Sequence, residues 1–129
     1  MERRWHAYVR DLSRLVSRAM REAGCAADVV LTDDRTIKQL NARDRGKNKP
    51  TNVLTYEHPA EILLGLGVVR REAQTAGRSV AAHLTHLLIH GALHLQGHDH
   101  DHVGDARRME AEEARLLARL GIANPWKNR

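Results

Sequence analysis

The sequence contains little of what disulfide-stabilised or membrane-spanning proteins need. Its single cysteine, Cys25, has no disulfide partner within the chain, which fits a reducing compartment. No segment approaches the roughly 18 uninterrupted apolar residues of a membrane span. The start, from Met1 to Arg14, also lacks the apolar run of a signal peptide. These absences predict a cytoplasmic protein with no membrane association.

Aromatic residues are also scarce, at 3% of the chain, and phenylalanine is absent. This scarcity argues against RNA-binding domains that stack bases on aromatic side chains. The formal net charge of +5 nevertheless suits an anionic partner, with nucleic acid first, although a solvated basic surface would give the same charge. If RNA binds, phosphate contacts should dominate.

Hydrophobic periodicity predicts one α+β domain over residues 1–129, with a small mixed sheet covered by helices. A chain of 129 residues can bury a core without a metal, so a bound metal would serve function rather than folding. Helices are expected over about residues 4–22, from Asp33 or Asp34 through Leu40, 79–96 and 105–120. Strands are expected at 28–32, 51–56 and 62–69, and Gly65 and Gly67 weaken the last of these.

The histidines of segment 90–100, HGALHLQGHDH, carry the strongest chemical signal. His90 and His94 lie four residues apart, which places them on one face of a helix about 6 Å apart. Gly97 is well placed to end that helix, and the returning chain would bring His100 to the same ion. Three neutral imidazoles with an open fourth position describe a catalytic zinc site. We therefore predict one Zn²⁺ per chain on His90, His94 and His100.

Neighbouring residues allow more than one interpretation. His98 is the rival third ligand, although Gly97 should divert it. His83 and His86 continue the same helical face, where they can orient the ligands by hydrogen bonds or simply pack. Asp99 can likewise orient a ligand imidazole or close the turn.

The histidine spacing equals the metzincin pattern H-E-x-x-H-x-x-G-x-x-H at every position but one. Metalloproteases use the glutamate after the first histidine as a general base, and Gly91 occupies that position here. The metal ligands are thus retained while the peptidase base is missing, which argues against proteolysis.

A second cluster, RGKNKPTN at residues 45–52, is basic. Arginine offers a planar fork that matches phosphate oxygens, and the two lysines add positive potential. Arg45 is the candidate catalytic residue that stabilises phosphate charge. Lys47, Lys49 and Asn52 are candidates for binding the substrate. A solvated loop is the alternative interpretation of the same charges.

Together these segments resemble a known family. Residues 90–100 resemble the H-G-x-L-H-L-x-G-[YH]-D-H motif of the YbeY endoribonucleases, the bacterial rRNA maturation factors. Leu40-Asn41, Arg45–Lys47 and Pro50–Leu54 resemble that family's second block, and the resemblance covers about residues 28–121. His83, His86, Met109 and Glu113 also fit the family pattern.

The resemblance implies a zinc-dependent, single-strand-specific endoribonuclease that acts in 16S rRNA processing, ribosome maturation and quality control. It implies zinc on the three histidines and a functional arginine at Arg45. The implied partners are single-stranded rRNA, small-subunit ribosomal proteins and an assembly GTPase. The chain departs from the family between Glu57 and Gly67, where it is shorter and carries Leu66 in place of an aspartate.

Two other functions fit parts of the sequence. One is a small zinc metallopeptidase, and the other is a non-catalytic rRNA-binding assembly factor with a structural zinc. For RNA cleavage, attack by an activated water and attack by the RNA 2′-hydroxyl are both open routes, and no general base is evident.

Overall fold

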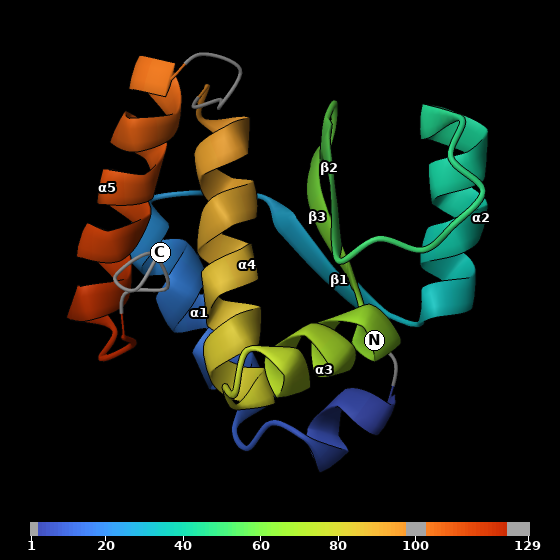
Figure 1. Cartoon of the computed structure of the whole chain (residues 1–129), viewed down its shortest axis with the longest axis horizontal. Coiled ribbons are helices and arrows are strands. Elements are labelled where there is room, and N and C mark those ends of the chain that lie inside the picture. Colours follow the sequence, from blue (N-terminus) through green and yellow to red (C-terminus); the bar gives the residue numbers. More distant parts are fainter. Residues whose placement is uncertain (1–2, 98–102, 124–129) are drawn as a thin grey trace.

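Helices surround a small sheet in the computed structural model, which describes residues 3–97 and 103–123 (Figure 1). The helical elements are η1 (Arg3–Ala7), α1 (Leu12–Ala23), α2 (Asp34–Arg45), α3 (Leu66–Thr75), α4 (Val80–Leu95) and α5 (Val103–Arg119). The strands are β1 (Asp28–Thr32), β2 (Val53–Glu57) and β3 (Ala60–Gly65). The expected α+β class is therefore confirmed.

The sheet has the strand order β1-β3-β2 and is mixed. β3 pairs in parallel with β1, from Asp28 opposite Glu61 to Thr32 opposite Gly65. It pairs antiparallel with β2 through a tight hairpin, in which Glu57 lies opposite Ala60. β2 is consequently an edge strand of this sheet, with one side open to residues from neighbouring elements.

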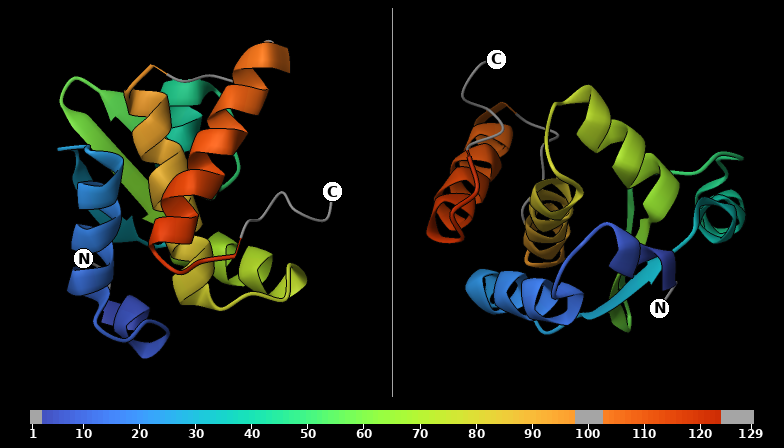
Figure 2. Two further views of the ribbon diagram at one scale, coloured as in Figure 1. Left: turned by 90° about the vertical axis from the view of Figure 1, so that its left-hand side faces the viewer. Right: turned by 90° about the horizontal axis from the view of Figure 1, so that it is seen from below.

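Helices cover both faces of the sheet unequally. α2 packs alone on one face, where Ile37, Leu54 and Leu63 form a small buried cluster. On the other face α4 packs against β2 and β3 and is itself flanked by α1, α3 and α5 (Figure 2). The larger core lies there, because alternate strand residues such as Ile62 and Leu64 point toward α4.

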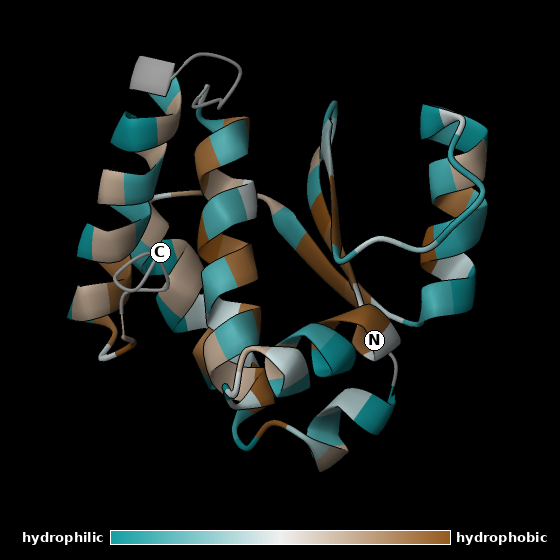
Figure 3. Ribbon diagram, viewed as in Figure 1, coloured by the Kyte–Doolittle hydropathy of each residue, from teal (hydrophilic) through white to brown (hydrophobic). Residues whose placement is uncertain are grey.

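α4 is the central helix of the molecule. Its N-terminus is capped by Ser79, whose Oγ accepts a hydrogen bond from the Ala82 amide at 3.0 Å. Most of its surface is buried and apolar, so the polar positions along it stand out (Figure 3). Among the described residues no helix is long and apolar enough to cross a membrane.

The single helix expected over residues 4–22 is wrong, because two elements occupy that stretch. η1 ends at Ala7 and α1 begins at Leu12. Asp11, which precedes α1, has a φ of 50° and interrupts the helical path. Trp5 is still buried as its periodicity predicts, and its indole nitrogen donates to the Thr32 carbonyl at 2.9 Å.

The strand expected over residues 62–69 is also wrong beyond Gly65, where α3 begins. The carboxylate of Asp34 occupies the space beside Gly65 and Gly67, and a Cβ on Gly67 would lie 2.2 Å from its Oδ2. That carboxylate accepts a hydrogen bond from the Val68 amide at 3.0 Å and so satisfies the first turn of α3. The glycines therefore permit a helix start.

Candidate metal centre

Four histidines form one stripe along α4, at residues 83, 86, 90 and 94. Successive ring centroids are 6.0, 6.4 and 4.7 Å apart, and the closest pair is His90 and His94. His90 and His94 are half-buried. The structure therefore brings together the first two predicted metal ligands as their helical spacing requires.

A buried carboxylate from α5 contacts the middle of this stripe. Glu113 is 1% exposed, and its two oxygens bond separate imidazoles. His90 Nδ1 donates to Oε1 in a short hydrogen bond, and His86 Nε2 lies 3.2 Å from Oε2. Burial by itself would raise the pKa of Glu113, but the hydrogen bonds from His86 and His90 outweigh it and lower the pKa to about 2. Glu113 is therefore an anion that only accepts hydrogen bonds.

These hydrogen bonds fix which nitrogen of each ring carries the proton. Since Glu113 accepts from His90 Nδ1, the lone pair of a neutral His90 is on Nε2. Arg78 can only donate, and its guanidinium lies 3.3 Å from His86 Nδ1, so His86 carries its proton on Nε2. A carboxylate that orients a ligand imidazole in this way is the usual support of a metal-binding histidine.

The third ligand falls outside the described residues. His100, its rival His98 and the supporting Asp99 all lie in segment 98–102. Within residues 3–97 and 103–123, no three metal-ligating side chains gather at one point. The donor set that is described fits two positions of a histidine-rich metal site, and His100 remains the predicted third.

His83, at the N-terminal end of the stripe, is hydrogen-bonded to a different acid. His83 Nε2 donates to Glu72 of α3 at 2.9 Å, and the Asn52 amide donates to the same carboxylate at 3.1 Å. Burial lowers the pKa of His83 although its bond to Glu72 opposes the shift. Asn52, expected to bind substrate, thus lies against Glu72 and links the start of β2 to α3.

Gly91 of α4 faces the sheet. A Cβ at this position would lie 3.1 Å from Ile62 Cγ2 and 3.3 Å from Thr55 Cγ2. Ile62 is fully buried, so the contact has little room to relax. A Cβ at residue 91 therefore requires Ile62 or Thr55 to shift by a few tenths of an ångström, and a glutamate would bring further atoms to the same contact.

The predicted basic cluster lies at the outer edge of β2. Arg45, at the end of α2, donates to the Thr55 carbonyl at 2.6 Å, and its guanidinium carbon lies 5.5 Å from the Tyr56 ring centroid. Arg45, Lys47 and Lys49 line one open hollow of about 490 Å³. The C-terminal ends of α2 and α4 lie at the same end of the molecule, and β2 lies between the two helices (Figure 1). Thr55 of β2 contacts both α2 and α4, because its carbonyl accepts from Arg45 and its methyl group faces Gly91.

The sequence of this chain is similar to those of known proteins. The family described as "Endoribonuclease YbeY" matches residues 1–121 of the chain. The chain belongs to the YbeY family. A relative from Gluconobacter oxydans named endoribonuclease YbeY is 49% identical over 96% of this chain and 83% of its own length. One from Chelativorans is 42% identical over 89% of this chain and 83% of its own length.

A solved protein from Thermotoga maritima shares the fold. Its solution structure superposes with a TM-score of 0.60 and 23% sequence identity, covering 85% of this chain and 83% of that one. The region from Glu57 to Gly67, expected to be shorter than in other YbeY family members, contains the β2–β3 hairpin and the start of α3. Leu66, which replaces the expected aspartate, is buried in the core.

The sequence predicted no role for Glu113, Glu72 or Arg78, although Glu113 fits the YbeY family pattern. Glu113 had a detectable signal, since it lies on the same helical face as the apolar residues Met109, Leu116 and Leu117. A lone carboxylate in an apolar stripe needs a partner. Glu72 and Arg78 gave no comparable signal, because their contacts depend on how α3 packs against α4.

Proposed function

We propose that this chain is a zinc-dependent endoribonuclease that cleaves single-stranded RNA. The observation that carries the proposal is the pair formed by His90 and the buried Glu113, next to His94. It leaves His90 Nε2 as the donor atom of a neutral ligand, which suits zinc. The relatives of this chain are named endoribonucleases, and RNA is accordingly the substrate class we assign.

The groups around the histidines favour a phosphodiester over a peptide. A glutamate at residue 91, the general base of a peptidase, would crowd Ile62 and Thr55. The hollow with Arg45, Lys47 and Lys49 adds three cations on the neighbouring strand edge. When bound, zinc supplies Lewis-acid chemistry for phosphodiester cleavage. Arg45 binds the phosphate through the remaining donors of its guanidinium, while Glu113 holds His90 in place.

Family membership supports a more specific biological role. We infer that single-stranded regions of 16S rRNA are the substrate, in maturation and quality control of the small subunit. Small-subunit proteins and an assembly GTPase are the proposed partners, in the cytoplasm. Co-sedimentation of the protein with purified small subunits tests this role, and the absence of any association would contradict it.

Cleavage of single-stranded rRNA fragments tests the proposed activity. The comparison includes zinc-loaded wild type, His94→Ala, Arg45→Lys and Arg45→Glu. Arg35→Glu is the matched control, because Arg35 is an exposed arginine of α2 outside the hollow. We expect His94→Ala to lose zinc and cleavage together. Arg45→Lys should be slower because a point charge loses the fork, and Arg45→Glu should be slower by roughly 100-fold or more.

Zinc content should be unchanged in both Arg45 variants. Wild-type rates in Arg45→Glu would contradict the role of Arg45 and leave Lys47 and Lys49 as candidates. RNA binding without metal-dependent cleavage would favour a non-catalytic assembly factor. Cleavage of peptides by the zinc-loaded protein would favour the metallopeptidase.

A further inference from the structure

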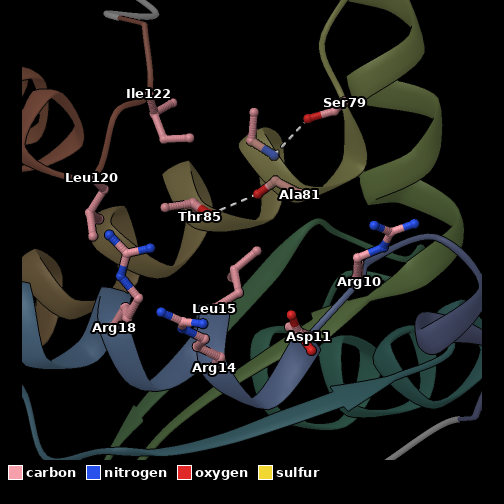
Figure 4. Close-up of a pocket in the computed structure, with 11 residues that line it drawn as sticks. Arg10, Asp11, Arg14, Leu15, Arg18, Ser79, Ala81, Thr85, Leu120 and Ile122 are labelled. Carbon is pink, nitrogen blue, oxygen red and sulfur yellow. Dashed lines mark hydrogen bonds between the residues drawn. The ribbon is translucent and has the colours of Figure 1, made fainter.

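A second basic hollow lies away from the histidine stripe, between α1 and the start of α4 (Figure 4). It has a volume of about 470 Å³ and is open to solvent. Arg10, Arg14 and Arg18 line its α1 side. The remaining lining residues are small or apolar, apart from the acidic Asp11: Leu15, Ser79, Ala81, Ala82, Thr85, Leu120 and Ile122.

The three arginines form a row with regular spacing. They are four residues apart in sequence, and Arg14 and Arg18 lie within α1, about 6 Å apart along its axis. All three are exposed, and within the described residues none forms an ion pair with a carboxylate. The nearby Glu22 pairs instead with Arg119, at 3.0 Å. The row therefore retains its guanidinium donors for an outside anion.

The walls of the hollow add to this electrostatic character. The first turn of α4 reaches the hollow at Ser79 and Ala81, and a helix N-terminus carries a partial positive charge. Asp11 is the one acidic residue among the lining side chains, against three arginines. Leu120 and Ile122 supply apolar surface that a ribose or base can contact. Together these features fit a nucleic-acid strand, whose phosphates would contact the arginines and whose riboses or bases would contact the apolar surface.

We infer that this hollow is a second contact site for RNA, which binds the phosphates of a strand outside the cleavage site. Thr85, in its wall, lies five residues before His90, so the two point about 140° apart around α4. A strand held there would extend around the molecule from the histidine stripe. The choice of RNA over an acidic peptide rests on the proposed function, because an arginine guanidinium donates to phosphate and carboxylate oxygens alike.

RNA-binding affinity measured against salt concentration tests this inference. The probe is an unstructured 20-nucleotide RNA, bound by the full chain in the presence of a chelator so that the strand stays intact. Arg14→Glu combined with Arg18→Glu should weaken binding tenfold or more at low salt. The slope of log affinity against log salt should fall by about 0.7 for each phosphate that the double variant no longer binds.

Two further variants make the test specific. Arg35→Glu makes the same substitution at one position of α2, outside the hollow, so it should change affinity much less than Arg14→Glu does alone. Asp11→Asn removes the one negative charge and keeps a residue type that tolerates its left-handed backbone, so it should strengthen binding. Circular dichroism and thermal unfolding establish that every variant is folded.

The outcomes separate this site from the proposed activity. Unchanged affinity and salt slope in the double variant, or an equal loss in Arg35→Glu, would overturn the RNA site. Binding of polyglutamate at the hollow without binding of RNA would also overturn it. Cleavage of a trinucleotide by the zinc-loaded double variant should equal wild type. Failure of the wild type to cleave any RNA would count against the proposed function alone.

Discussion

Glu113 is the buried carboxylate of the described residues, and each of its oxygens accepts a hydrogen bond from an imidazole of α4. A buried anion is stable only when it is paired, and here the two histidines provide the pairing. The same bonds orient His90, so folding and metal affinity depend on one side chain. Stability and metal binding should therefore change together when Glu113 is altered.

Glu113→Gln keeps the shape of the side chain but removes its charge. The amide can accept from only one imidazole at its oxygen and presents a donor to the other. We expect zinc affinity to fall by about 10- to 100-fold, the usual cost of losing a ligand's supporting partner. The free energy of unfolding should fall by about 1–3 kcal/mol.

Competition with a chromophoric chelator measures the affinity, and thermal unfolding measures the stability. Glu112→Gln is the matched control, since Glu112 is the adjacent residue of α5 and pairs with the exposed Arg115. Equal zinc affinity in both variants would show that Glu113 does not orient a ligand.

At the scale of elements, glycines that let side chains approach the backbone closely decide where α4 and α3 lie. Gly91 lets α4 contact the sheet directly, which places the histidine stripe beside the edge strand β2. Gly65 and Gly67 let the Asp34 carboxylate reach the first turn of α3. α3 in turn carries Glu72 to His83. These glycines therefore position the acids and the histidines relative to one another.

Gly91→Glu would restore the metalloprotease sequence at this position. We expect it to destabilise the protein by about 3 kcal/mol or more, because it adds bulk and a charge between α4 and Ile62. Gly91→Ala should cost about 1 kcal/mol, since better helix propensity offsets part of the clash. Urea unfolding measures both effects. A Gly91→Glu protein as stable as wild type that cleaves peptides would refute the packing argument.

Asp34→Ala tests the start of α3. The variant loses the hydrogen bond to the Val68 amide and the exposed ion pair with Arg71. We expect a loss of about 1 kcal/mol, mostly from the cap, because exposed ion pairs contribute little. Asp34→Asn should keep most of the stability because its amide oxygen still accepts. Equal thermal midpoints for wild type and Asp34→Ala would contradict the capping role.

At the scale of the whole molecule, local sequence pattern predicted most of the elements but not all of their contacts. The helix that carries His90 and His94 could be predicted because the spacing of its histidines, its length and the glycine after it agree. α3 was missed because its start depends on Asp34, a residue distant in sequence. The bond from Asn52 to Glu72 was missed for the same reason. Local pattern cannot report a partner that arrives through tertiary packing.

Metal removal tests whether the protein stays folded without the ion. The larger hydrophobic cluster includes Trp5, Leu31, Ile62 and Leu117 and joins the sheet to α1, α4 and α5. We therefore expect the chelated protein and His94→Ala to keep their helicity by circular dichroism and to unfold cooperatively. Global unfolding on chelation would instead indicate a structural metal.

The coordination of the metal tests the central claim most directly. X-ray anomalous scattering at the zinc edge, from crystals of the zinc-loaded protein, locates the ion and its ligands. We predict one zinc at about 2.0–2.1 Å from a nitrogen of His90, His94 and His100, bound to His90 through Nε2. Its fourth position should hold no protein atom. A fourth protein ligand, His98 in place of His100, or no zinc beside His90 and His94 would contradict the account.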